Sequence, residues 1–310
     1  MVEFDDLFER AHEFPDPDAD DRFARLVGIG EHKAALETTI SLLVAPKQFD
    51  AWSEWAGLLG TPLIEAVRSR PPLVVLAGDV GSGKTELAET IGAPVSRRTE
   101  TDIILLPLSL STRGQGRVGE MTQLVSAAFD QTLRMGEERI IGDGRVSGGV
   151  ILLVDEADAL AQSRENGQMH HEDKAGVNAF IRGIDRLKNS NAPVAVIMCT
   201  NRLGSLDPAI RRRAANILEF GRPSLEQRQA VFAVYLSDAG LDDHALQRIA
   251  EATGPQGEGV YGMTFSDITQ RLLPEAAFAA YRSNSKVTET IILETAARTA
   301  PTPPFNEPVR

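Results

Sequence analysis

One glycine-rich run in the chain combines the residue types that bind phosphate. It reads Gly78-Asp-Val-Gly-Ser-Gly-Lys84-Thr85 and fits the spacing G-x-x-x-x-G-K-[ST]. Glycines let backbone N–H groups turn toward an anion, and the lysine ammonium adds a point charge on the same oxygens. A threonine hydroxyl is a ligand type for Mg²⁺. We therefore predict a nucleotide site formed by Gly78, Asp79, Val80, Gly81, Ser82, Gly83, Lys84, Thr85 and Glu86.

Two adjacent carboxylates follow an apolar run further along the chain. Asp155 and Glu156 come directly after Ile151-Leu-Leu-Val154. In an open α/β sheet, ligands bind outside the carboxyl ends of the strands, which is where this pair would lie. We expect Asp155 to support Mg²⁺ through water and Glu156 to orient and deprotonate an attacking water. The pair therefore predicts hydrolysis of ATP and not only phosphate binding.

Two further groups of polar residues are candidates for the same reaction. Asn201 ends the apolar run Val194–Cys199, and there it is expected to contact the γ-phosphate and position water. Three arginines, at positions 211 to 213, end a short predicted helix. Such a run is most often a solvated face, but here we predict that Arg212 and Arg213 act as arginine fingers in a neighbouring subunit's site.

Alternating strands and helices must position these residues. Short apolar runs predict strands at 73–77, 103–108, 149–154 and 194–199, and helical spacing predicts helices at about 31–43, 84–91, 121–135 and 174–187. Parallel strands joined by helices form an α/β sheet. After Gly221–Ser224 only helices are expected, at about 225–239, 242–252, 265–282 and 286–299, and Ser224 is the expected N-cap of the first.

This organisation divides the 310 residues into four expected parts. Residues 1–21 hold nine acidic residues against one arginine and are predicted to be a flexible acidic arm. Residues 22–222 form the large α/β domain, and residues 223–300 form a small helical domain. Residues 301–310 contain four prolines and are predicted to be a disordered tail.

Composition excludes several classes of protein. The hydrophobic fraction is 42%, which is enough for a packed core. The formal net charge of −12 opposes binding to phosphate backbones, so no direct contact with nucleic acid is expected. A single cysteine, Cys199, excludes an intrachain disulfide. No apolar stretch approaches the ~20 residues of a membrane span, so we expect no membrane contact and a cytoplasmic location.

Taken in this order, the motifs resemble those of AAA+ ATPases, from about residue 24 to residue 300. Leu26–Gly30 resembles the entry motif whose backbone, here at Gly28 and Ile29, flanks adenine. The segment Gly262–Ile268 resembles the start of the second-sensor helix, which implies nucleotide contact near Asp267, although Ser266 stands where many relatives have arginine. The resemblance implies a P-loop NTPase with a parallel five-stranded sheet flanked by helices, a small all-α lid, and ATP and Mg²⁺ as cofactors.

Within AAA+ proteins, the chain resembles the pachytene checkpoint protein and thyroid receptor interactor protein family. Three segments carry this likeness: Asp155–Arg164, Val177–Asp185 and Gly221–Ser224. The resemblance implies a homohexamer that uses ATP to open or disassemble complexes of HORMA-domain proteins. A bacterial branch of this family is linked to anti-phage nucleotide signalling. We expect the HORMA protein to bind directly or together with its closure peptide.

The family resemblance also implies a substrate-gripping pore loop, for which Arg117 and Val118 are the candidates. Arg117 stands where ring translocases usually have an aromatic residue, and Val118 keeps an apolar side chain. Two alternatives to HORMA remodelling stay open. One is another AAA+ remodeller or unfoldase that is rubisco-activase-like, severing or protease-feeding. The other is an ATP-dependent assembly switch or clamp-loader-like module that does not thread its substrate.

Overall fold

The computed structural model describes residues 7–109, 120–142, 145–158, 171–202, 204, 206–257 and 261–304. The chain divides into two compact units. The sheet unit contains Met1–Phe23, Glu31–Ala77 and Thr85–Glu219. The helical unit contains Ala24–Gly30, Gly78–Lys84 and Phe220–Arg310. The glycine-rich run up to Lys84 therefore groups with the helical unit, whereas Thr85 groups with the sheet unit.

In the part of the chain that the structure describes, the sheet has six strands in the order β1-β3-β4-β5-β2-β6. Their bounds are β1 His12–Phe14, β2 Leu73–Gly78, β3 Asp102–Ser109, β4 Gly148–Asp155, β5 Val194–Thr200 and β6 Ala214–Phe220. Strands β3, β4, β5 and β2 pair in parallel, so their carboxyl ends meet at one edge. The α/β fold is confirmed, but the sheet is mixed and has one strand more than predicted, because β1 pairs antiparallel with β3.

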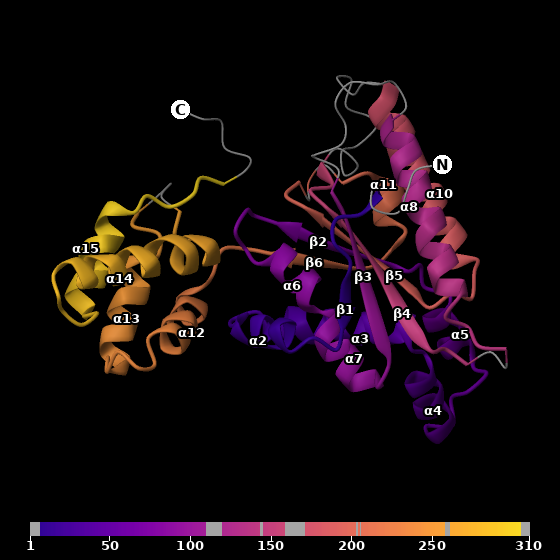
Figure 1. Ribbon diagram of the computed structural model, residues 1–310, viewed down its shortest axis with the longest axis horizontal. Helices are drawn as coiled ribbons and strands as arrows, with labels where there is room; N and C mark the ends of the chain where they lie inside the picture. The colour runs from indigo at the N-terminus through magenta and orange to yellow at the C-terminus, as the bar shows by residue number, and fades with distance from the viewer. Residues whose placement is uncertain are drawn as a thin grey trace. The chain divides into compact units, whose positions relative to one another are not determined.

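Helices cover both faces of this sheet (Figure 1). The helices described between Pro17 and Arg211 are α2 Pro17–Arg25, α3 Gly30–Val44, α4 Lys47–Trp55, α5 Pro62–Arg68, α6 Lys84–Thr90, α7 Gly92–Thr99, α8 Glu120–Glu137, α10 His171–Lys188 and α11 Pro208–Arg211. Helices α8 and α10 pack together, with the rings of Phe129 and Phe180 edge to face at 5.4 Å between centroids. Their apolar residues share one core with Val150, Leu152 and Val154, since alternate residues of a strand face the same side.

The prediction of a flexible acidic arm is wrong for residues 7–21. His12–Phe14 form β1 at the edge of the sheet, and α2 begins at Pro17. Leu7, Phe8 and Phe14 are buried, at 5%, 3% and 3% exposure. Burying one such side chain stabilises a fold by about 1.5–3 kcal/mol. The prediction of a flexible arm rested on the acidic composition and not on these apolar residues. Their burial stabilises the segment more than the repulsion between its acidic side chains destabilises it.

The helical unit contains α12 Leu225–Tyr235, α13 Asp243–Ala252, the π-helix η2 Asp267–Leu272, α14 Leu273–Arg282 and α15 Glu289–Arg298. Its core is formed mainly by Phe232, Ile249, Ile268 and Ile292, all fully buried. Ser224 caps α12 as predicted, in a capping box with Gln227. Residues 301–304 are not a disordered tail, because Thr302 is hydrogen-bonded to the carboxylate of Asp267. Among the described residues, no helix is long and apolar enough to cross a bilayer.

Candidate functional site

The glycine-rich run forms a tight loop between β2 and α6. Gly81 and Gly83 have φ values of +72° and +93°, in the left-handed region that glycine adopts without strain. A Cβ atom on Gly81 would also lie 2.7 Å from the hydroxyl oxygen of Thr264. Both positions therefore require glycine, as the sequence pattern predicted.

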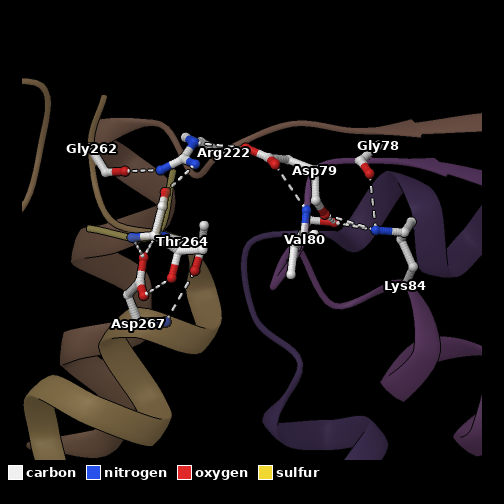
Figure 2. A network of polar contacts seen from close by, with 10 residues as sticks. Gly78, Asp79, Val80, Lys84, Arg222, Gly262, Thr264 and Asp267 are labelled. Carbon is white, nitrogen blue, oxygen red and sulfur yellow. Dashed lines mark hydrogen bonds and ion pairs between the residues drawn. The ribbon is translucent and has the colours of Figure 1, made fainter. Parts of the chain in front are cut away.

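Lys84 lies beneath this loop, with only 6% of the residue exposed. Its Nζ donates to the carbonyl oxygens of Asp79 at 2.7 Å and Gly78 at 3.1 Å, and it lies 3.4 Å from the hydroxyl of Ser82 (Figure 2). The side chain of Asp79 in turn accepts from the Val80 N–H at 2.9 Å. The loop thus holds an ammonium group among its own backbone atoms, which suits the binding of phosphate.

The metal candidates Thr85 and Asp155 meet within the sheet unit. The Thr85 hydroxyl donates to Asp155 Oδ1 at 3.3 Å. Burial raises the pKa of Asp155, and the nearby carboxylates of Glu156 and Glu89 add to this, against hydrogen bonds from the Glu156 N–H and Thr85. A hydroxyl and a carboxylate are hard oxygen ligands, and a cation beside them would offset the crowding of negative charge. The donor set fits Mg²⁺.

Glu156 is exposed and directly follows β4. Its φ is +49°, a left-handed conformation that is rare outside glycine, asparagine and aspartate. Its N–H donates to Asp155 Oδ1 at 2.9 Å. Such backbone strain costs on the order of 1–3 kcal/mol and clusters at functional sites, so it fits the catalytic role predicted for this residue.

Asn201 is joined to the segment after β4 through a residue that sequence reasoning missed. Asp158 Oδ1 accepts from the Thr200 hydroxyl and from the Asn201 N–H, both at 2.8 Å. These bonds connect the carboxyl end of β5 to the residues that follow Glu156. The only signal in the sequence was a third acidic residue close behind Asp155 and Glu156.

The two predicted arginine fingers have different surroundings. Arg213 forms a two-point ion pair with Asp185, at 2.7 and 2.9 Å, and also donates to the Ala209 carbonyl. The hydrogen bond with Asp185 raises the pKa of Arg213. Arg212 is exposed at the end of α11. Asp185 closes the family-like segment Val177–Asp185, so this pairing gives that segment a structural role.

The predicted adenine-flanking residues are held by the capping box of α12. The Gln227 side chain donates to the Gly28 carbonyl at 2.6 Å, while its oxygen accepts from the Ser224 N–H at 2.8 Å. Ile29 is buried, at 5% exposure. One side chain therefore both caps the helix and fixes the backbone at Gly28.

Asp267 is buried and bound within the helical unit. Its carboxylate accepts from Thr264 N–H at 2.9 Å and from the N–H and hydroxyl of Thr302 at 3.0 and 2.6 Å. Burial acts to raise the pKa of Asp267, but these hydrogen bonds outweigh it and leave the pKa below its ordinary value. The neighbouring Ser266 N–H donates to the Gly81 carbonyl at 3.0 Å, so this segment touches the loop through its backbone.

Glu86 and the pore candidates complete the predicted set. The Glu86 carboxylate is paired with Arg22 of α2 at 2.8 and 3.0 Å, and Arg22 also contacts Glu89 at 2.6 Å. This places Glu86 in an ion-pair cluster on α6. Arg117 and Val118 lie outside the described residues.

Comparisons with known proteins agree with this arrangement. Residues 74–222 match the family described as "ATPase family associated with various cellular activities (AAA)". The chain is 55% identical over 301 residues to CD-NTase-associated protein 6 of Escherichia coli strain MS 115-1, covering 97% of this chain and 96% of the relative.

Two solved structures have the same architecture over nearly the whole chain. A chain of the E. coli MS115-1 HORMA:CdnC:Trip13 complex has a TM-score of 0.89 and 53% identity, covering 98% of this chain and 99% of that chain. Rhizobiales Trip13 has a TM-score of 0.76 and 46% identity, covering 96% and 100%. With the phosphate loop, the acidic pair and the fold all in agreement, the chain belongs to the AAA ATPases and, within them, to the family of CD-NTase-associated protein 6.

Proposed function

We propose that this chain is an ATP-hydrolysing motor that assembles as a homohexamer and opens or disassembles complexes of a HORMA-domain protein. The observation that carries the proposal is the likeness, over almost the full length, to a chain of the E. coli MS115-1 HORMA:CdnC:Trip13 complex. The presence of both an acidic pair after β4 and a complete phosphate loop in the sequence favours a hydrolase over a passive nucleotide binder.

In this proposal the loop residues bind the nucleotide. The backbone N–H groups between Gly78 and Gly83 and the ammonium of Lys84 bind the β- and γ-phosphates. The Thr85 hydroxyl and the Asp155 carboxylate would hold Mg²⁺, whose charge offsets that of the phosphate oxygens. Gly28 and Ile29 flank the adenine.

Glu156 acts as the general base. It takes a proton from the attacking water, and Asn201 orients that water toward the γ-phosphate. Asp158 keeps the Asn201 backbone in place. The exposed Arg212, or Arg213 once it is released from Asp185, stabilises transition-state charge in the site of the neighbouring subunit.

The output of hydrolysis is mechanical work on the HORMA protein. The closed form of such a protein wraps a peptide, and opening it breaks a strand ladder and exposes apolar surface. We propose that Val118 and Arg117 contact a flexible substrate segment at the ring's pore. The HORMA protein binds directly or as a complex with its closure peptide.

The test is release of a fluorescent closure peptide from a HORMA-domain protein of the kind named in the E. coli MS115-1 HORMA:CdnC:Trip13 complex. We expect release that requires ATP and is lost with Glu156→Gln, which keeps the size of the side chain but removes the base. ATP hydrolysis by this variant should fall by ~10²-fold or more while ATP binding persists. Native mass spectrometry of the same variant with ATP should show six subunits.

Two results would redirect the proposal. If the ATP-trapped Glu156→Gln protein binds no HORMA protein, the substrate assignment fails, and another AAA+ remodeller is the better reading. If wild-type protein hydrolyses ATP and binds the HORMA protein but never releases the peptide, an assembly switch without threading is favoured.

A further inference from the structure

Arg222 connects three segments of the helical unit that are far apart in the sequence. Its Nε donates to Asp79 Oδ2 at 2.8 Å, its Nη1 to the Gly262 carbonyl at 2.5 Å and its Nη2 to the Thr302 carbonyl at 2.5 Å (Figure 2). The guanidinium also lies over the Tyr261 ring, 4.7 Å from its centroid. Every nitrogen of the side chain therefore has a defined partner.

The first of these contacts reaches into the phosphate loop. Asp79 is the second residue of that loop, and its other carboxylate oxygen accepts from Val80 N–H, while its carbonyl accepts from Lys84. The Arg222 and Asp79 side chains are each only 16% exposed, so their ion pair is less screened than a surface pair. Arg222 thus contacts the loop through the carboxylate of Asp79, a residue whose own carbonyl accepts from Lys84.

The third contact reaches the C-terminal segment, which we define as residues 301–304. Thr302 makes most of the polar contacts of this segment: its carbonyl accepts from Arg222, and its N–H and hydroxyl donate to Asp267. Arg271 adds longer contacts with the Thr302 hydroxyl and the Ala300 carbonyl. Pro301 and Ala300 border a surface cavity of about 540 Å³, lined in part by Tyr261, Met263 and Leu293. The hydrogen bonds of Thr302 therefore attach the segment at one edge of this cavity.

A second connection runs between the same two places. The Asp267 N–H donates to the Thr264 hydroxyl at 3.1 Å, and the next residue back, Ser266, donates to the Gly81 carbonyl. The phosphate loop and Thr302 are thus joined through Asp79 and Arg222, and also through Gly81 and the Thr264–Asp267 segment.

We propose that Arg222 is a positioning residue for nucleotide binding, and that it does this by coupling the phosphate loop to the docked C-terminal segment. Nucleotide binding orders the loop, holds Asp79 against Arg222 and stabilises docking at Thr302. By thermodynamic reciprocity, loss of docking weakens nucleotide binding by the same factor. This coupling goes beyond the proposed function, because it concerns the nucleotide alone and holds for any protein substrate.

The first test is the affinity for a fluorescent ADP analogue. We expect Arg222→Ala to raise Kd by about tenfold and Arg222→Lys to raise it less, since lysine keeps the charge beside Asp79 but cannot reach all three acceptors. Thr302→Pro, which removes both donors to Asp267, should raise Kd in the same direction. The matched control is Arg248→Ala, which breaks a two-point pair with Glu289 in the same unit and should leave Kd unchanged.

A second measurement distinguishes coupling between nucleotide binding and docking from a contact that only stabilises the fold. A dye on Pro303→Cys, in a chain whose native Cys199 is buried, reports the mobility of the C-terminal segment. We expect saturating ADP to raise the dye's anisotropy in the otherwise wild-type chain and to leave it unchanged with Arg222→Ala. The effects of Arg222→Ala and Thr302→Pro on Kd should be less than additive. Three results would each overturn the proposal. They are an unchanged Kd in a folded Arg222→Ala protein, fully additive effects of the two substitutions on Kd, and a dye anisotropy that does not change with ADP in the otherwise wild-type chain.

Discussion

The backbone N–H of Asn201 donates to the carboxylate of Asp158 at 2.8 Å. The bond links the residue expected to orient the attacking water to the segment that carries the expected base. Catalytic geometry tolerates little displacement, and a 1 Å misplacement can cost on the order of 10²-fold in rate.

We therefore predict that Asp158→Ala lowers kcat for ATP hydrolysis by about 10- to 100-fold with little change in nucleotide Kd. Asp158→Asn keeps an acceptor oxygen and should lose less. Steady-state kinetics with parallel binding measurements check this. An Asp158→Ala protein that loses nucleotide binding but keeps kcat would contradict it.

Variants of Arg212, Arg213 and Asp185 distinguish which of the two arginines acts as the finger. We predict that Arg212→Ala lowers hydrolysis by around 10³-fold without affecting stability. Mixing it with Glu156→Gln subunits should restore activity, because each site would draw on two chains. Arg213→Ala and Asp185→Asn should behave alike and cost at most about 1 kcal/mol of unfolding free energy, since their ion pair is partly exposed.

If Arg213→Ala abolishes hydrolysis while Asp185→Asn does not, Arg213 acts in trans and its pairing with Asp185 is a resting arrangement.

Gln227 offers a selective test of the adenine-flanking segment. Gln227→Glu keeps the oxygen that caps Ser224 but removes the N–H that donates to the Gly28 carbonyl. We predict a loss of about 10-fold in ADP affinity, in the range of one hydrogen bond, with the binding of inorganic pyrophosphate unchanged. Isothermal titration with both ligands checks this, and an equal loss for both would show that Gly28 does not act on adenine.

The lowered pKa of Asp267 predicts how the stability of the protein depends on pH. Its pKa in the folded protein is below its ordinary value, so its ionised form stabilises the fold at neutral pH, and that contribution is lost as pH falls below about 4. Its charged neighbour is Arg271, whose Nη1 donates to Asp267 Oδ1 at 2.9 Å. Oδ2 accepts both the Thr264 and the Thr302 N–H, whereas Oδ1 accepts from the Thr302 hydroxyl and Arg271. Asp267→Asn therefore turns one of these acceptors into an NH2 group that faces other donors, which costs about 1–3 kcal/mol at pH 7.

Urea unfolding at a series of pH values compares Asp267→Asn with wild type. The difference between them should be constant from pH 7 to about 5 and should shrink below about pH 4. A difference that grows as the solution becomes more acidic would contradict the prediction.

Residue types and their spacing are enough to predict the phosphate loop and the acidic pair. Gly81, Gly83, Lys84 and Thr85 could be predicted because each role depends on a residue type at a fixed spacing along a strand, a turn and a helix. The buried strands were predictable for a similar reason, since short apolar runs in an α/β protein have few other places to go.

The polar partners of these residues could not be predicted, because they depend on how distant segments pack in three dimensions. The pairs Asp158–Asn201, Asp185–Arg213 and Asp79–Arg222 join residues 28 to 143 positions apart. No local spacing specifies such a partner, because a polar side chain in a loop is satisfied equally well by water until packing excludes it. The burial of Leu7, Phe8 and Phe14 was hidden likewise, because it depends on the open edge of β3 and not on the acidic residues around them.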